Sequence, residues 1–214
     1  EVDSIRLAPA VLPALEVMIQ YMVRPGSPVI VPTPAYMPFL TIPPALNHPV
    51  IDVPSLHDEA YPGGWTLDLE GIKAGLEAGA GLVILCNPWN PVGRVLTESE
   101  MRALQMLVSE YDALVFADEI HSPLVLGGRG FTSYARLGAE FAAHTITATA
   151  ATKGWNNAGL PNAQVIVPDQ ELRARWDRVC QEKLPHSTST IGALGTIEAY
   201  TNGDDWQHEV LSVI

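Results

Sequence analysis

The sequence predicts an α/β fold in which a mostly parallel sheet is sandwiched by helices. Two apolar patterns alternate along the chain, one with the period of a helix and one made of short, β-rich runs. The short runs are continuously apolar, which indicates strands buried on both faces, as in a parallel sheet covered by helices. No low-complexity linker or internal repeat interrupts the 214 residues, so one α/β domain is expected.

The first half of the chain opens with a predicted helix at residues 10–23, which ends at Arg24, Pro25 and Gly26. Asp68 is the expected N-cap of a later helix, because its carboxylate can accept a bond from a free backbone N–H. The remaining predicted elements are strands at 29–31, 48–53 and 82–85, helices at 35–41 and 68–78, and a loop at 54–66 that is rich in Pro, Gly and Asp.

The second half continues the same alternation of helices and strands. Thr97 and Glu100 have the spacing of a capping box, which predicts that a helix begins at this point. The other predicted elements are strands at 113–117, 145–149 and 165–167, and helices from about 170 and about 188.

The composition narrows the range of partners and compartments. The net charge of −12 offers no basic stripe to displace counterions from phosphates, which argues against a nucleic-acid partner. No apolar run reaches the length of a membrane span, so no membrane partner is expected. Cys86 and Cys180 lack metal-type spacing and indicate a reducing compartment, so we expect a cytoplasmic protein. The start at Glu1 and the apolar end at 211–214 suggest a fragment of a longer protein.

Unusual polar residues follow three of the predicted strands. Asn87 and Asn90 come after the strand at 82–85. Asp118 and His121 come after the strand at 113–117, and Lys153 comes after the strand at 145–149. Because ligands of open α/β sheets bind outside the carboxyl ends of the strands, these side chains are expected to converge at one edge. Their convergence predicts a functional site.

Together these segments resemble the fold-type-I enzymes that depend on pyridoxal 5′-phosphate (PLP), in the class I/II aminotransferase superfamily. The resemblance extends from about Pro9 to Gln164. Three stretches are most similar to the cystathionine β-lyase, or C–S lyase, branch: P-A-Y-x-x-F from Pro34, D-E-I-H from Asp118, and K-x-W-N-x-x-G-L from Lys153. The resemblance implies the large domain of that fold at residues 1–185, truncated at its N-terminus, and the start of a link to a C-terminal small domain at 186–214.

The resemblance implies PLP as the cofactor and assigns three residues to it. Lys153 would bond to the cofactor's aldehyde and later move the Cα proton of the substrate. Asp118 would hold the protonated ring nitrogen, with an attraction on the order of 4 kcal/mol at about 4 Å. Asn90 would donate to the phenolic oxygen. Taken alone, these residues have other interpretations: a surface lysine, a helix N-cap and a turn former.

Further cofactor contacts are implied at other positions. His121 would lie near the phenolic oxygen, Tyr36 would stack on the ring, and Thr152 would assist the phosphate or the lysine. The alternative for His121 is a core histidine with a satisfied hydrogen bond. Without the resemblance, Tyr36 could equally be a packing residue. No metal site is expected, since no second cluster of ligands accompanies the Asp-Glu-x-His stretch.

The sequence departs from the family at its phosphate contacts. Ala150 and Pro161 stand where the family usually has a serine and a basic residue. Phosphate would then depend mainly on the backbone amides of Ala10 and Val11, at the start of the first helix. Ala10 itself replaces the usual glycine, so the departures put the cofactor affinity in question.

The implied function is cleavage of the C–S bond of cystathionine or a cysteine S-conjugate by α,β-elimination. Transamination of an amino acid by the same residues is the alternative, and a non-catalytic PLP-fold regulator is a third. A plain Rossmann nucleotide binder is disfavoured, because no G-x-G-x-x-G follows the first strand. The family implies a small amino-acid substrate and a homodimer of the full-length protein, and the residue that binds the substrate carboxylate is expected outside these residues.

Overall fold

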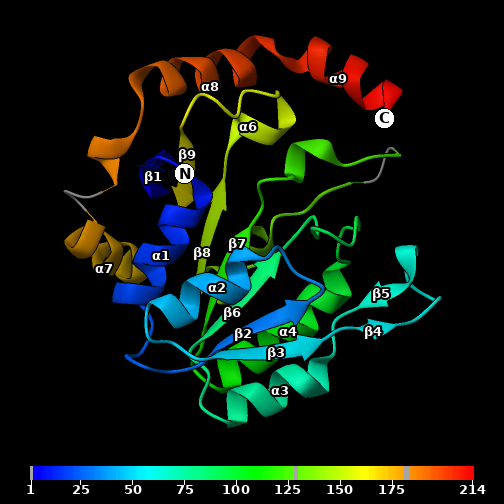
Figure 1. Cartoon of the computed structure of the whole chain (residues 1–214), viewed down its shortest axis with the longest axis vertical. Coiled ribbons are helices and arrows are strands. Elements are labelled where there is room, and N and C mark those ends of the chain that lie inside the picture. The colour runs from blue at the N-terminus through cyan, green and yellow to red at the C-terminus, as the bar shows by residue number, and fades with distance from the viewer. Residues whose placement is uncertain (1, 128–129, 181–183) are drawn as a thin grey trace.

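The computed structural model describes residues 2–127, 130–180 and 184–214 and contains a seven-stranded sheet with helices on both faces (Figure 1). The strand order is β1-β9-β8-β7-β6-β2-β3. Strands β3, β2, β6, β7 and β8 are parallel, whereas β9 is antiparallel to both of its neighbours. The prediction of a mostly parallel sheet sandwiched by helices is confirmed.

The strands of the large sheet are short and mostly buried. Their bounds are β1 Ile5–Ala8, β2 Val29–Thr33, β3 Val50–Pro54, β6 Leu82–Cys86, β7 Leu114–Asp118, β8 Thr145–Thr149 and β9 Ala163–Ile166. Every predicted strand exists within a few residues of its expected position. Strand β1 was not predicted, because its alternating exposed and buried residues span only four positions.

The helices form a layer on each face of the sheet. Their bounds are α1 Val11–Tyr21, α2 Pro38–Ala45, α3 Leu69–Glu77, α4 Glu98–Glu110, α5 Ala139–Ala142, α6 Ala151–Gly154, α7 Gln170–Cys180, α8 Thr190–Asn202 and α9 Asp204–Val213. Short 3-10 helices are η1 Val2–Ser4, η2 Pro62–Gly64, η3 Ser122–Leu124, η4 Tyr134–Leu137 and η5 Pro185–Ser187. Helices α1, α2 and α7 share one apolar core with the sheet, and α3, α4 and α5 share the other.

Two helix starts follow the capping rules that the sequence predicted. Asp68 accepts a hydrogen bond from the backbone N–H of Gly71 at 3.0 Å, and Thr97 and Glu100 form a complete capping box. The predicted loop at 54–66 is wrong in part, because a small hairpin of β4 Leu56–His57 and β5 Trp65–Thr66 lies within it. Strands of two residues are too short to produce an alternating pattern.

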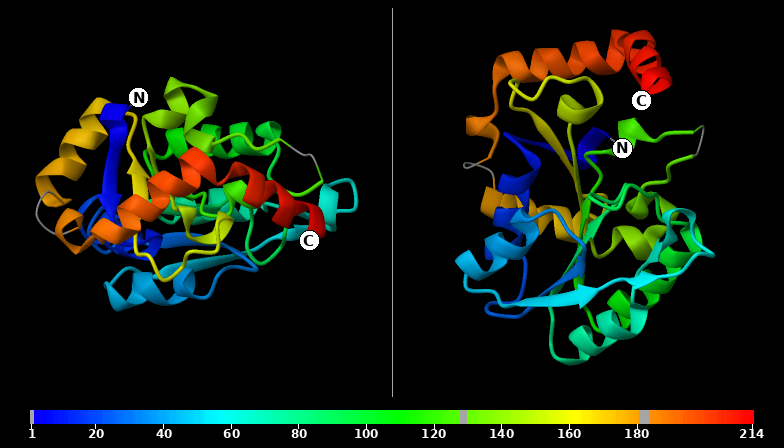
Figure 2. Two further views of the ribbon diagram at one scale, coloured as in Figure 1. Left: turned by 90° about the horizontal axis from the view of Figure 1, so that it is seen from above. Right: turned by 45° about the vertical axis from the view of Figure 1, so that its right-hand side comes forward.

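Helices α8 and α9 lie across the end of the domain that also carries α6, as the two views in Figure 2 show. The outer face of α8 exposes Ile191, Leu194 and Ile197, each more than 60% exposed. Within the described parts of the chain, we find no helix with the length and apolarity needed to cross a membrane.

Candidate active site

The carboxyl ends of β6, β7 and β8 meet at one edge of the sheet. Asp118, the last residue of β7, lies in register with Cys86 of β6 and with Ala148 of β8. The segments that follow these three strands carry the polar residues selected from the sequence, so the predicted convergence at this edge occurs. The geometry of each residue determines what the edge can bind.

Asp118 is a buried carboxylate with only 4% of its surface exposed. Its Oδ1 atom accepts a hydrogen bond from the backbone N–H of Ile120 at 3.0 Å. Burial raises the pKa of Asp118 to about 6, although the Ile120 N–H and the positive charge of Lys153 lower it in part. The ionised carboxylate is poorly solvated, so a cation beside it would stabilise it strongly.

Lys153 extends from α6, the short helix that directly follows β8. Its side chain is exposed, and its charge acts on both Asp118 and His121. Helix α6 packs tightly against η3, since a Cβ atom at Gly154 would lie only 2.6 Å from Cβ of Pro123. This close approach requires glycine at position 154 and holds Lys153 beside the segment that follows β7.

His121 is half-buried and comes immediately before η3. Burial lowers the pKa of His121, and the nearby Lys153 charge lowers it further. The imidazole is therefore neutral at pH 7. Its Nδ1 atom is buried and has no hydrogen-bond partner. Because buried polar atoms are normally paired, this nitrogen is suited to a hydrogen bond with a bound ligand.

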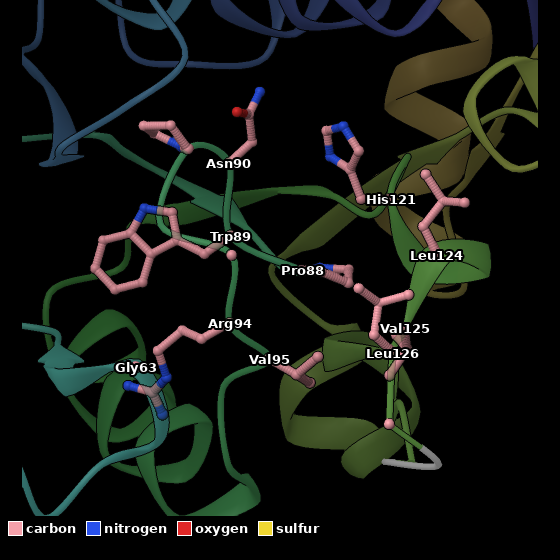
Figure 3. A pocket seen from close by; sticks show the side chains of 13 residues that line it. Gly63, Pro88, Trp89, Asn90, Arg94, Val95, His121, Leu124, Val125 and Leu126 are labelled. Atoms are coloured by element: carbon pink, nitrogen blue, oxygen red, sulfur yellow. The ribbon is translucent and has the colours of Figure 1, made fainter. Parts of the chain in front are cut away.

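Asn90 is presented by a tight turn between β6 and α4. The backbone N–H of Trp89 donates to the carbonyl of Arg94 at 2.8 Å, and that of Gly93 donates to the carbonyl of Trp89 at 2.7 Å. Asn90 and His121 both line a cavity of about 550 Å³. In Figure 3 the Asn90 amide and the His121 ring point to the same side at one end of this cavity.

A buried ion pair, which the sequence analysis missed, braces the Asn90 turn. Arg94 donates from both terminal nitrogens to the Glu100 carboxylate, at 2.9 and 2.6 Å, and the two side chains are 1% and 6% exposed. Glu100 also accepts from Thr66 and Thr97, and Arg94 also donates to the carbonyl of Trp65. The network therefore joins the turn, the start of α4 and the small hairpin.

Tyr36 lies on the segment after β2 and is 42% exposed. Its ring packs edge-on against Phe39, with 5.6 Å between the ring centroids. Trp89 Nε1 donates to the carbonyl of Pro34 at 3.0 Å and ties this segment to the turn that carries Asn90. The ring of Tyr36 thus has an exposed face on a segment that is bonded to the candidate site.

The remaining predicted residues lie at the starts of α1 and α6. Ala10 is the N-cap of α1 and makes no capping bond with its side chain. Val11 is buried in the same apolar core as Ala150, which precedes α6. Thr152 is half-buried within α6. The starts of α1 and α6 therefore pack into the same apolar core, on one face of the sheet.

A second buried carboxylate, Glu119, follows Asp118, and the sequence analysis assigned it no role. Its Oε1 atom accepts from the backbone N–H of Tyr134 at 3.0 Å, and burial raises its pKa to about 7. The Tyr134 hydroxyl in turn bonds to Nε2 of His144, 3.1 Å away. These contacts anchor the segment around η4 to the sheet, so Glu119 is interpreted as a structural residue. Among the described residues, no group of three or more His, Cys, Asp or Glu could hold a metal ion.

Comparison with known proteins places the chain in a family. A family model described as aminotransferase class I and II matches residues 4–199. This chain belongs to the class I and II aminotransferase family. The matched segment contains every strand of the large sheet together with Asp118 and Lys153, so the resemblance inferred from the sequence is confirmed.

Curated members of the family include lyases and aminotransferases. The cystathionine beta-lyase of Corynebacterium glutamicum is 33% identical over 214 residues, which cover 99% of this chain and 55% of that protein. The cystathionine beta-lyase PatB of Bacillus subtilis is 32% identical and is covered to 54%. An aspartate aminotransferase of Geobacillus stearothermophilus is 26% identical over 191 residues, 88% of this chain and 46% of that protein. The chain spans about half the length of the curated relatives it matches.

Solved structures of family members have the same architecture. Cystalysin from Treponema denticola, a structure that contains PLP, superposes with a TM-score of 0.91 at 26% identity and covers 100% of this chain and 54% of that one. A putative PLP-dependent β-cystathionase from Corynebacterium diphtheriae gives a TM-score of 0.87 at 33% identity. The match covers 99% of this chain and 54% of that one. Several family members of known structure are thus bound to PLP or named for it.

Proposed function

We propose that the full-length protein is a PLP-dependent C–S lyase that cleaves cystathionine or a cysteine S-conjugate by α,β-elimination. The single observation that carries the proposal is the buried carboxylate of Asp118, with its raised pKa, within electrostatic range of the Lys153 ammonium. Relatives named cystathionine beta-lyase, at 33% and 32% identity, support the choice of reaction.

The residues at the sheet edge fit PLP. The poorly solvated carboxylate of Asp118 suits a protonated ring nitrogen, which would return the electrostatic stabilisation that burial removes. The unpaired Nδ1 of His121 and the neighbouring amide of Asn90 suit the phenolic oxygen. When bound, PLP supplies an electron sink for the electron pair that remains when the Cα proton is removed.

Lys153 is proposed as the residue that bonds to the cofactor and then transfers protons. In elimination, its neutral amine takes the proton from Cα of the substrate, and the Cβ–S bond breaks with the electron pair leaving on sulfur. The sulfur takes up a proton and leaves as the thiol, and water hydrolyses the remaining three-carbon amine to pyruvate and ammonia. Exposure of the side chain gives the amine the freedom to move between these tasks.

The phosphate is proposed to bind at the starts of α1 and α6. The backbone amides of Ala10 and Val11 lie at the positive end of α1, and the Ala10 side chain does not cap them. Thr152 would contribute a hydroxyl from α6. Tyr36, whose ring is 42% exposed, is proposed to stack on the cofactor.

Transamination is the second candidate function. The aspartate aminotransferase relative at 26% identity favours it, and the same lysine, aspartate and asparagine would serve both reactions. The two reactions differ in the fate of the proton taken from Cα. In transamination it returns to the cofactor, whereas in elimination Cβ loses its sulfur substituent.

The organisation of the whole protein is also a proposal. Residues 1–185 would form the cofactor-binding domain, and 186–214 would lead to a small domain, in a homodimer located in the cytoplasm. The exposed apolar face of α8, with Ile191, Leu194 and Ile197, supports a covering partner there, because monomeric surfaces seldom leave such residues grouped in water.

The test uses the full-length protein with PLP. Release of pyruvate from cystathionine, without a requirement for a ketoacid, supports the lyase, whereas ketoacid-dependent amine exchange supports the aminotransferase. Lys153→Ala should abolish both activities. It should also abolish the covalent attachment of PLP to this position that borohydride reduction would otherwise fix. Lys73→Ala, at an exposed lysine that pairs with Glu77, is the matched control and should retain both. Equal activity of the two variants would contradict the assignment of Lys153.

A further inference from the structure

A cavity of about 550 Å³ adjoins the candidate site and extends beyond the residues assigned to the cofactor. Its volume lies within the range of small-molecule sites, roughly 300 to 1,000 Å³. Asn90 and His121 line one end, as Figure 3 shows. Since these two residues are proposed to contact the cofactor, a substrate bound to the cofactor would have this cavity beside it.

One wall of the cavity is apolar. Leu124, Val125 and Leu126 follow His121 along the chain and lie on one side, and Val95 lies at the end away from Asn90 (Figure 3). The opposite side is formed by Trp89 and the turn that leads to Arg94. An apolar group that entered this space would therefore be surrounded by aliphatic and aromatic carbon.

Among the described residues that line the cavity, the one permanent charge is neutralised by an ion pair, and Nε of the same arginine is buried without a hydrogen-bond partner. Arg94 has the only permanently charged side chain among them, and both of its terminal nitrogens are bonded to Glu100 in a pair that is almost fully buried. Burial also lowers the pKa of His121 and keeps its imidazole neutral at pH 7. Among these described residues, a charged group in the cavity would lose its water without finding an oppositely charged side chain that is not already in an ion pair.

We propose that this cavity binds the sulfur substituent of the substrate and selects neutral, apolar alkyl or aryl groups over the zwitterionic end of cystathionine. The inference rests on the proposed lyase function and names its substrate class. The reaction is unchanged: the Cα proton passes to Lys153, and the Cβ–S bond breaks with its electron pair on sulfur. The sulfur takes up a proton and leaves as a thiol, and water converts the remainder to pyruvate and ammonia.

The test compares two substrates with the full-length holoenzyme at pH 7. We expect kcat/KM for pyruvate release to be at least about tenfold higher with S-benzyl-L-cysteine than with L-cystathionine, the scale of discrimination typical of apolar pockets. Equal values, or a preference for cystathionine, would overturn the substrate class and leave the lyase function intact. Absence of pyruvate from both substrates would overturn the lyase function and this inference together.

A variant with a charge on the apolar wall tests whether that wall causes the preference between the two substrates. Leu126→Asp puts a carboxylate on the apolar wall, at a side chain that is 46% exposed and so tolerant of change. We expect the ratio of the two kcat/KM values to fall about tenfold. Leu56→Asp is the matched control, since Leu56 is 50% exposed and lies on β4 outside the cavity lining, and its ratio should equal that of the wild type. An unchanged ratio in Leu126→Asp overturns the proposal.

Discussion

Replacing Asp118 with Asn is predicted to stabilise the cofactor-free protein while it disables the cofactor site. Burial raises the pKa of Asp118 from 3.8 to about 6, so ionisation of this group costs the folded state free energy. Asn keeps an oxygen to accept the Ile120 N–H bond and carries no charge. The variant therefore avoids the cost of burying an ionised carboxylate.

The size of the effect follows from the change in pKa. The folded pKa is raised, so the contribution of Asp118 to stability is greatest below about pH 4 and is lost as the pH rises through 6. The full difference corresponds to about 3 kcal/mol. Asp118→Asn should be more stable than the wild type by about 3 kcal/mol at pH 8 and by about half as much at pH 5.

Urea denaturation of the cofactor-free, full-length protein at both pH values measures this difference. Asp58→Asn is the control, because Asp58 is exposed and an Asn there also keeps the acceptor for the Ala60 N–H. With PLP added, the wild type should gain more stability than Asp118→Asn. The reasoning is refuted if Asp118→Asn shows no gain at pH 8, or a gain that does not grow between pH 5 and pH 8.

Three further substitutions test the packing around the site. Glu100→Gln should lower the free energy of unfolding by about 3 kcal/mol, because it leaves the buried Arg94 charge unpaired, and denaturation measures the loss. Gly154→Ala should cost about 1–3 kcal/mol and reduce PLP occupancy, since its Cβ atom would meet Pro123, and absorbance reports the occupancy. Ala150→Ser should cap α6, add about 0.5–1 kcal/mol and tighten PLP binding severalfold in titrations.

Each of these predictions has its own control or contrary result. Glu77→Gln removes a carboxylate from an exposed pair and should change stability by less than about 0.5 kcal/mol. A stable Gly154→Ala protein with full PLP occupancy would contradict the tight packing of α6 on η3. Unchanged PLP affinity in Ala150→Ser would mean that position 150 does not contact the phosphate.

The sequence was sufficient to predict most of the fold, because its signals are local. A continuous apolar run such as 82–85 indicates a strand that is buried on both faces of the sheet. The Thr97–Glu100 spacing indicates a capping box, which lies within a single helical turn. The convergence at the edge of the sheet also followed from order alone, since parallel strands place their carboxyl ends together. Asp118 and Lys153 were found by this rule.

Features made by contacts between distant segments could not be predicted. Arg94 and Glu100 are six residues apart, a spacing that no helix or strand rule associates, and their partner Thr66 comes from a hairpin of two-residue strands. Glu119 was visible beside Asp118, but its bond to the backbone of Tyr134 depends on how η4 returns to the sheet. Tertiary packing decides these contacts.

The charges of Asp118 and Lys153 in the candidate site are close enough to interact, yet the described ion pairs do not join them. A direct pair would bring the pKa of Asp118 well below its ordinary value, whereas burial keeps it raised. An aromatic cofactor that bonds to an amine at one end and presents a cationic nitrogen elsewhere on its ring needs such a separation. The fold provides this separation by ending β7 with a buried acid and by carrying an exposed lysine in the last turn of α6. The proposed cofactor site would account for the destabilising burial of Asp118.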